Sequence, residues 1–234
     1  MGSIFKFKQF EVSQSGCAMK INTDGVILGA IAQQDSPLRV LDVGTGTGVI
    51  AMMLAQRFPA AVIDAVEIDE SAASAAAFNF NNSKFADRLK ASHGDIGSYE
   101  PGRKYDLIVS NPPYFVNDLK NPEKRKQLAR HADELFFEIL VKKIAELLTE
   151  NGKAWLILPV KQAEYVVKQA REYGLSLCRQ INVCSDEQKP IIRHIICLSA
   201  LEQRYKSEMF YIYQDQGVYT QAYKTLLKDF FLAF

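Results

Sequence analysis

The sequence has few of the residues that build metal sites and disulfide frameworks. Its 234 residues include four cysteines, three histidines and one tryptophan. No two cysteines form a C-x-x-C pair, and no histidine keeps a ligand spacing with a cysteine, so the pattern argues against a zinc site. Three of the cysteines lie in apolar, strand-like runs, where thiols serve as small core residues of a protein in a reducing compartment.

Long apolar runs and a surplus of one charge are also missing. No apolar stretch reaches the roughly 18 residues of a membrane span, and the first residues lack the apolar centre of a signal peptide. The 28 Lys and Arg residues nearly balance the 27 Asp and Glu residues, so any contact with a polyanion must be local. We therefore expect a cytoplasmic protein that binds no metal and no membrane.

Apolar residues make up 48% of the chain, enough to bury a large core at this length. Strand-like runs alternate with helical patterns as far as Gly174, which is typical of a parallel sheet covered on both faces. The sequence predicts strands at 38–43, 62–67, 89–92, 105–110 and 154–158, and helices at 49–58, 71–81, 135–148 and 162–173.

The rhythm changes after Gly174. Two runs, about 175–184 and 191–200, flank a polar segment and predict an antiparallel excursion at the edge of the sheet. The tail 219–231 has helical spacing. Since no repeat, low-complexity segment or linker interrupts the chain, we expect one doubly wound α/β domain, 1–234, in which 1–37 form an extension and 38–234 the core.

The tetrapeptide Asn111-Pro112-Pro113-Tyr114 directly follows the apolar run 105–110. Each proline fixes its own φ near about −65° and restricts the residue before it to extended geometry, so the corner is rigid. It presents an amide oxygen, a backbone carbonyl and an aromatic ring together. These groups can hold the two hydrogens and the flat face of a planar primary amine. The simpler alternative is a Pro-Pro turn.

A glycine-rich segment, 44–48, follows the first strand of the core with the sequence Gly-Thr-Gly-Thr-Gly. Ligands of open parallel sheets lie beyond the carboxyl ends of the strands, so topology should bring this segment close to the tetrapeptide. A dinucleotide-binding G-x-G-x-x-G motif needs its third glycine at the position of Val49. The spacing therefore weakens an NAD-dependent reductase as an alternative.

Acidic residues end or follow the next two strands. Glu67 can accept hydrogen bonds from both hydroxyls of a ribose, and Asp95 can accept from an adenine amino group, with Ile68 and Ile96 as apolar walls. Each acid also has a simpler interpretation, Asp95 as the N-cap of a turn and Glu67 as a solvated strand end. Their occurrence with the glycine segment after three successive strands favours a nucleoside cofactor.

Two of these motifs resemble those of a known family. Val40–Gly48 resembles the first motif of class I S-adenosylmethionine-dependent methyltransferases, and Asn111–Tyr114 resembles their amino-group-methylating motif. The chain resembles the bacterial valine-tRNA adenine N6-methyltransferases over nearly its whole length. The segments that carry this narrower resemblance are 5–10, 18–25 and 219–231. The resemblance implies a Rossmann-like, mostly parallel sheet with an antiparallel C-terminal edge. It also implies methyl transfer from S-adenosylmethionine to N6 of the adenine 3′ of the anticodon.

With the residues above, the resemblance implies two sets of site residues, no metal, a tRNA partner and, as the favoured state, a monomer. The expected catalytic residues are Asn111, Pro112, Pro113 and Tyr114. The expected cofactor-binding residues are Thr23, Asp42, Gly44, Thr45, Gly46, Gly48, Glu67, Ile68, Asp95, Ile96 and Asn111.

The segment 120–130 carries five positive charges against the single negative charge of Glu123. It follows the tetrapeptide within a few residues, where cations can contact the phosphates of an RNA substrate. A solvated loop is the alternative. The expected RNA-binding residues are Lys120, Lys124, Arg125, Lys126 and Arg130.

Other acceptors of the methyl group stay open. A glutamine amide is also a planar NH2, but release-factor glutamine methyltransferases are expected to carry a helical domain first, and only 37 residues precede Leu38. A DNA adenine methyltransferase would need a further target-reading module. A guanine N2 amine of ribosomal RNA remains an alternative, because the corner does not distinguish guanine from adenine. A non-catalytic RNA-binding module is disfavoured by the intact tetrapeptide.

Overall fold

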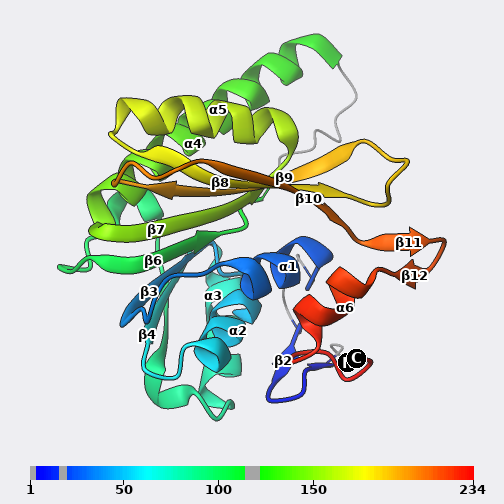
Figure 1. Ribbon diagram of the computed structural model, residues 1–234. Coiled ribbons are helices and arrows are strands. Elements are labelled where there is room, and N and C mark those ends of the chain that lie inside the picture. Colours follow the sequence, from blue (N-terminus) through cyan, green and yellow to red (C-terminus); the bar gives the residue numbers. More distant parts are fainter. Residues whose placement is uncertain (1–3, 16–19, 114–121) are drawn as a thin grey trace.

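The computed structural model describes residues 4–15, 20–113 and 122–234, except for the side chains of 122–133. An eight-stranded sheet crosses the molecule, with helices on both of its faces (Figure 1). Its strand order is β10-β8-β9-β7-β6-β3-β4-β5. The strands are β3 (Arg39–Val43), β4 (Val62–Glu67), β5 (Leu89–His93), β6 (Tyr105–Ser110), β7 (Leu148–Leu158), β8 (Ser176–Cys184), β9 (Ile191–Ser199) and β10 (Lys206–Tyr211).

Seven of these strands run in one direction, and β9 alone is antiparallel to its neighbours β7 and β8. The parallel strands β3 and β6 are buried over most of their length because helices cover both faces of the sheet. The carboxyl ends of β3, β4, β5 and β6 therefore lie next to one another at one edge. This is the edge at which ligands of open α/β sheets bind.

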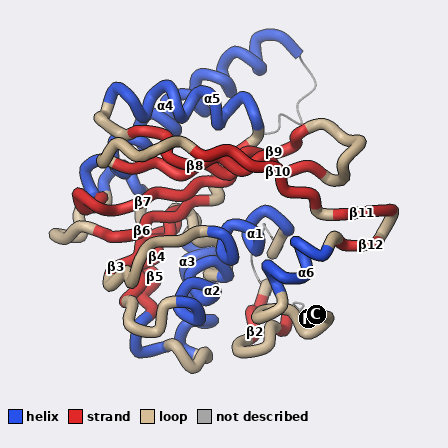
Figure 2. The backbone as a smooth tube through the Cα atoms, viewed as in Figure 1, coloured by secondary structure: helices blue, strands red, loops and turns tan. Residues whose placement is uncertain are grey.

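The helices divide into two layers with separate apolar cores, one on each face of the sheet (Figure 2). Residues of α1 (Thr23–Ile31), α2 (Val49–Arg57), α3 (Glu70–Asn81) and α6 (Gln221–Leu227) pack into the first core. Residues of α4 (Pro122–Leu147) and α5 (Val160–Glu172) pack into the second. The smaller elements are β1 (Ile4–Lys6), β2 (Glu11–Ser13), η1 (Ala86–Arg88), η2 (Ile96–Ser98), β11 (Tyr213–Asp215) and β12 (Val218–Tyr219).

Polar side chains at the helix N-termini define where three helices begin. The side chain of Asn22 accepts a hydrogen bond from the Gly25 amide at the start of α1, and Asp69 and Thr220 cap α3 and α6 in the same way. Each cap satisfies one of the backbone donors that the first turn of a helix leaves without an intrahelical partner. The cap of α1 also lies beside Asn111 of the proline corner.

The two ends of the described chain lie side by side (Figure 1). Phe7 and Phe231 form an isolated antiparallel bridge. The Lys8 ammonium donates hydrogen bonds to the backbone oxygens of Lys228 and Phe234, both at 2.6 Å. Farther along, the Ser13 amide donates to Asn79 of α3 at 2.9 Å. The expected N-terminal extension is thus packed against the core at several points.

The fold class expected from the sequence is confirmed, and most of the expected elements lie within two residues of their predicted bounds. The antiparallel pair β8–β9 is confirmed too, but β9 lies inside the sheet and β10, which was not expected, forms the edge parallel to β8. Helix α4 begins at Pro122 instead of 135, because its charged first turns lack the apolar stripe that marks a buried helix. Strand β7 begins at Leu148 instead of 154, where Asn151 and Gly152 indicate a turn but form an irregularity in the pairing with β6.

Candidate active site

A cavity of about 350 Å³ lies at the carboxyl ends of β3, β4, β5 and β6, and is called the sheet-end cavity below. Residues of the glycine segment, of the acidic strand ends and of the proline corner all line it. One turn of α4 contributes further residues. The lining residues are Val43, Gly44, Val66, Glu67, Ile68, Gly94, Asp95, Ile96, Ser110, Pro112, Pro113, Leu135, Phe136 and Ile139. The expected meeting of the glycine segment with the proline corner is therefore observed.

The glycine segment makes a tight turn that only glycine tolerates at three positions. Gly44, Gly46 and Gly48 have φ values of 71°, 56° and 86°, in the left-handed region that other residues seldom adopt. A Cβ atom at Gly48 would also collide with the ring of Phe80 in α3. Glycine at position 48 thus serves two purposes, the left-handed turn and the close approach of α3.

The buried side chain of Asp42 stabilises this turn through hydrogen bonds. It is completely buried, and its Oδ2 accepts hydrogen bonds from the Thr45 hydroxyl at 2.6 Å and the Ala51 amide at 3.2 Å. Its Oδ1 has no hydrogen-bond partner among the described residues. Burial raises the pKa of the Asp42 carboxyl to about 7, although the two hydrogen bonds oppose the shift. Asp42 therefore orders the turn, and it retains one buried acceptor atom.

Glu67 connects the glycine segment to the end of β4. Its Oε2 accepts from the Gly46 amide at 2.9 Å, and its Oε1 accepts from the Asp69 amide at 3.0 Å. A carboxylate oxygen has room for a second hydrogen bond. The simpler interpretation of Glu67 as a solvated strand end is therefore incomplete. Its side chain holds the glycine turn and also lines the cavity.

Asp95 starts the short η2 helix. Its Oδ1 accepts from the Gly97 amide at 2.8 Å, which confirms the N-cap interpretation of this residue. The capping bond occupies one of the two carboxylate oxygens, and Asp95 still lines the cavity. The two interpretations of Asp95 are therefore compatible with each other.

The apolar walls of the cavity come from two sides. Ile68 and Ile96 follow β4 and β5, as expected from the sequence. On the other side lie Leu135, Phe136 and Ile139 of α4, which the sequence analysis did not include in the site. The spacing of Leu135 and Ile139 predicts that they share a helix face. Only the packing of α4 on the sheet shows that this face closes the cavity.

The proline corner lies at the cavity and against the start of α1. Pro112 and Pro113 line the cavity, whereas the Asn111 Nδ2 atom donates to Asn22 Oδ1 over 3.5 Å. Asn22 Oδ1 also accepts from the Gly25 amide at 2.8 Å, so it acts as an acceptor and must face the NH2 group of Asn111. The Asn111 oxygen consequently points away from Asn22. Ser110 donates to the Val43 carbonyl at 2.9 Å and joins the ends of β6 and β3.

The remaining expected residues take other places. Thr23 is exposed in the first turn of α1 and does not line the cavity. Thr45 and Asp42 lie beneath the glycine turn. Tyr114 and Lys120 lie outside the described residues, as do the side chains of the other expected RNA-binding residues, Lys124, Arg125, Lys126 and Arg130. Among the described residues, no group of three His, Cys, Asp or Glu side chains could hold a metal ion. None of the helices in the described ranges is long and apolar enough to cross a membrane.

Residues 23–170 match the family model of the methyltransferase small domain. The chain is also 57% identical over its full length to a tRNA1(Val) (adenine(37)-N6)-methyltransferase of Pedobacter heparinus, and covers all of that protein. It belongs to this methyltransferase family. A relative of the same name from Parabacteroides distasonis is 42% identical, with 97% of each chain covered.

Solved structures of other methyltransferases share the fold. A predicted O-methyltransferase from Agrobacterium tumefaciens superimposes with a TM-score of 0.69 over 88% of this chain and 96% of its own, at 16% identity. A ribosomal protein L11 methylase from Lactobacillus delbrueckii gives a TM-score of 0.58 over 83% and 84% of the two chains, at 18% identity. The fold resemblance in the sequence is thus confirmed, and the protein is a methyltransferase.

Proposed function

We propose that the protein transfers the methyl group of S-adenosylmethionine to the N6 amine of adenine 37, 3′ of the anticodon, in a valine tRNA. The names of the full-length relatives support this substrate. The observation that carries the proposal is structural. The proline corner, the glycine turn and the acids Glu67 and Asp95 meet at one cavity, so groups that suit a substrate amine lie beside groups that suit a nucleoside.

The residues of the sheet-end cavity fit the cofactor. Its volume of about 350 Å³ lies in the range of pockets that bind small molecules. S-adenosylmethionine carries a nucleoside and two cationic groups, a sulfonium and an ammonium. Apolar side chains on both sides suit an adenine ring, Glu67 and Asp95 offer oxygens to hydroxyl and amino groups, and the unpartnered Asp42 Oδ1 offers a buried acceptor for positive charge. Contacts of Thr23, Gly46 and Gly48 with the cofactor stay a prediction, because none of the three residues lines the sheet-end cavity.

Asn111 and Pro112 hold the substrate amine. The lone pair of an aromatic amine is delocalised into its ring, so the amine is a poor nucleophile. The Asn111 side-chain oxygen and the Pro112 carbonyl each accept one N–H hydrogen bond, which favours a pyramidal nitrogen with a localised lone pair. Bound S-adenosylmethionine supplies the electrophilic methyl group. The acceptors strengthen their bonds as positive charge develops on the nitrogen, so they stabilise the transition state more than the ground state.

Positioning supplies much of the remaining acceleration. A neutral hydrogen bond contributes only about 0.5–1.5 kcal/mol, so two such bonds do not account for a typical enzymatic rate. The rigid corner holds the base in one orientation and removes the entropic cost of alignment from the chemical step. No strong general base is required, because the quaternised nitrogen loses its proton readily. Stacking of the base on Tyr114 contributes about 1–3 kcal/mol.

Positive charge beside the corner binds the RNA backbone. Lys120, Lys124, Arg125, Lys126 and Arg130 contact phosphates, which sets the register of the tRNA on the enzyme without reading its sequence. A tRNA substrate also places the reaction in the cytoplasm.

Nucleoside mass spectrometry of tRNA tests the proposal. Purified tRNA from cells lacking the gene should have no N6-methyladenosine at position 37 of the valine tRNA, and incubation with the protein and S-adenosylmethionine should restore it. If the missing nucleoside is instead N2-methylguanosine in ribosomal RNA, the guanine alternative replaces the adenine one. Loss of methylation of a release factor without any change in RNA would favour the glutamine alternative.

A further inference from the structure

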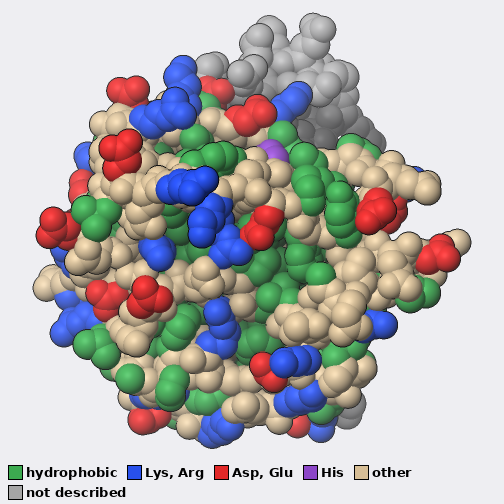
Figure 3. All heavy atoms as spheres, viewed as in Figure 1, with side chains coloured by type: hydrophobic (Ala, Val, Ile, Leu, Met, Phe, Trp, Pro, Cys, Tyr) green, Lys and Arg blue, Asp and Glu red, His purple; other side chains and the backbone are tan. Residues whose placement is uncertain are grey.

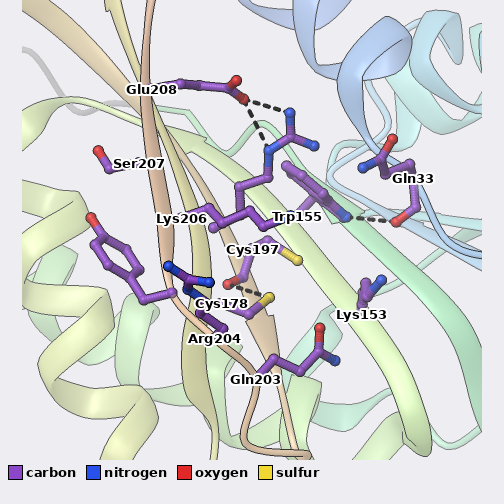
Figure 4. A pocket seen from close by; sticks show the side chains of 12 residues that line it. Gln33, Lys153, Trp155, Cys178, Cys197, Gln203, Arg204, Lys206, Ser207 and Glu208 are labelled. Carbon is purple, nitrogen blue, oxygen red and sulfur yellow. Dashed lines mark hydrogen bonds and ion pairs between the residues drawn. The ribbon is translucent and has the colours of Figure 1, made fainter.

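A second hollow of about 730 Å³, separate from the sheet-end cavity, lies on the face of the sheet against which α1 packs. Its floor is formed by Trp155 of β7, Cys178 of β8 and Cys197 of β9, all of them buried (Figure 4). Gln33, just after α1, forms one wall, and the chain entering β10 forms the other. We call this hollow the basic groove.

Positive charge dominates the walls of the basic groove. Among the described residues that line it, Lys153, Arg179, Arg204 and Lys206 are basic and Glu208 alone is acidic. The groove thus has an excess of three positive charges in a chain whose net charge is +1. In the space-filling view, Lys and Arg side chains gather over β8 and its neighbours (Figure 3). The charge is a local feature of this surface.

Three of the four cations have no ion-pair or hydrogen-bond partner in the described part of the chain. Glu208 is hydrogen-bonded to Arg179, with the Arg179 Nε atom 2.9 Å from Glu208 Oε1. The structure shows no ion pair or side-chain hydrogen bond of Lys153, Arg204 or Lys206 with any described residue. Cations that only balance nearby acids are commonly paired with them. These three are instead available to an anion from outside the chain.

The groove is built on rigid elements. Trp155 Nε1 donates to the Gln33 carbonyl at 2.9 Å (Figure 4). The Arg179 guanidinium lies 5.7 Å from the Trp155 ring centroid. Lys206 pairs with Arg179 across β10 and β8, and Lys153 pairs with Ser199 across β7 and β9. The backbones of Lys153, Arg179 and Lys206 are therefore fixed by the sheet, and Arg204 lies in the connection that enters β10. Preorganisation of this kind lowers the entropic cost of binding.

The spacing of the cations suits a polymer of phosphates. Lys153 and Lys206 lie on strands three steps apart in the sheet, about 14 Å at about 4.8 Å per step. This span equals about four nucleotides of a stacked strand at about 3.4 Å each. A single small anion would contact one end of the groove, whereas successive phosphates can reach all of the cations.

The groove and the catalytic corner lie at opposite ends of α1. Asn22 caps the start of α1 beside Asn111, and Gln33 follows its end and lines the groove. Gln33 lies eleven positions after Asn22, which corresponds to about 16 Å at about 1.5 Å per residue. An RNA whose target base lies at the corner thus has backbone phosphates within reach of the groove, about five stacked nucleotides away.

From these observations we propose that the basic groove binds backbone phosphates of the tRNA at a distance from the methylated base. This inference rests on the proposed function, since it assigns a second contact to the same substrate. The contact is sequence-independent and contributes affinity and register, while the corner performs the chemistry. None of the described residues that line the groove belongs to the segment 120–130.

A charge-removing double variant tests the groove. Arg204→Gln together with Lys206→Gln removes two exposed, unpartnered cations and leaves the backbone pairing of β10 in place. The slope of log affinity for tRNA against log salt concentration should become shallower by about 1.4–1.8. Between about 50 and about 200 mM salt, the wild-type protein should then lose about tenfold more affinity than the variant.

The matched control removes the same charge elsewhere. Lys90 in β5 and Lys104 before β6 are also exposed, and they lie away from the groove. Lys90→Gln with Lys104→Gln should keep the wild-type slope. Calorimetric affinity for S-adenosylmethionine and the rate at saturating tRNA should be unchanged in both double variants. An unchanged slope in the groove variant, or an equal decrease in the control, would overturn the inference.

The outcomes separate the groove from the proposed reaction. If the wild-type protein forms N6-methyladenosine in tRNA and the groove variant binds with the wild-type slope, the groove inference fails and the function stands. If the wild-type protein binds tRNA with a groove-dependent slope and forms no N6-methyladenosine, the function fails and the groove stands.

Discussion

The sheet-end cavity and the basic groove use opposite chemistry on the same sheet. The cavity is small, with acids whose oxygens are already bound to backbone amides of the glycine turn and η2. The groove is about twice as large, and three of its cations have no ion-pair or hydrogen-bond partner among the described residues. Acids fixed by the fold suit a compact cationic cofactor, whereas unpaired cations spread over several strands suit a long polyanion.

The two sites also differ in burial, which decides how each responds to pH. Asp42 beneath the cavity is completely buried, whereas Arg204 and Lys206 of the groove are exposed. Water screens exposed charges, and burial shifts the protonation of an isolated acid. The stability contributed by the residues beneath the cavity should therefore depend on pH near neutrality. The affinity of the groove for anions should depend on salt concentration.

The largest expected effect is the pH dependence of stability that comes from Asp42. Burial raises its pKa from 3.8 to about 7, so the protein without cofactor should lose stability as pH rises from about 4 to about 7. The shift corresponds to about 4 kcal/mol at most. Asp42→Asn, which keeps one acceptor oxygen, should lack this loss. Urea unfolding of both proteins from pH 4 to pH 8 measures it, and parallel pH profiles would contradict the raised pKa.

Asn111→Ala should lower the transfer rate by about 10²–10³-fold, the typical effect of removing one group that stabilises developing charge. Affinity for S-adenosylmethionine should remain nearly intact, because Asn111 acts on the substrate amine. Single-turnover transfer and calorimetry measure the two quantities separately. Asn151→Ala, at an exposed position in β7, is the matched control and should change neither. A loss of cofactor affinity as large as the loss of rate would contradict the assigned role.

Gly48→Ala should destabilise the protein by about 1–3 kcal/mol, since it combines a left-handed φ with a collision against the Phe80 ring. Gly102→Ala provides the control. Gly102 also has a positive φ, of 66°, but a Cβ there meets nothing within 4 Å, so this variant should lose only about 1 kcal/mol. Urea unfolding gives both values. Equal losses would show that Phe80 moves aside and that the packing of α3 does not constrain the turn.

The smallest expected effect concerns Asn22, which orients the Asn111 amide. Asn22→Ala should lower kcat severalfold, and Asn22→Asp should restore it because a carboxylate accepts both bonds. Asp69→Ala removes a comparable cap from α3 and should lower stability by about 1 kcal/mol without changing kcat. Steady-state kinetics with urea unfolding distinguishes the two variants. A fall in kcat for Asp69→Ala equal to that for Asn22→Ala would assign the effect to lost stability.

Sequence patterns predicted the local parts of the cofactor region well. Alternating strands and helices placed Gly44, Glu67, Asp95 and Pro112 after successive parallel strands, and the switch-point rule then predicted their meeting. Leu135 and Ile139 were expected in a helix but not at the cavity. Helical spacing shows which residues share a face, and it does not show what the face covers.

The sequence by itself determined the turns and ends of the elements, because φ restrictions at proline and freedom at glycine act within a few residues. It thereby determined the proline corner and the glycine turn, and the apolar pattern predicted the positions of the core strands along the chain. Only the tertiary structure decided the long-range features, namely β9 inside the sheet, α4 over the cavity and the cations of the basic groove. Lys153 and Lys206 lie far apart in the chain, and strand pairing, which local sequence does not encode, brings them together.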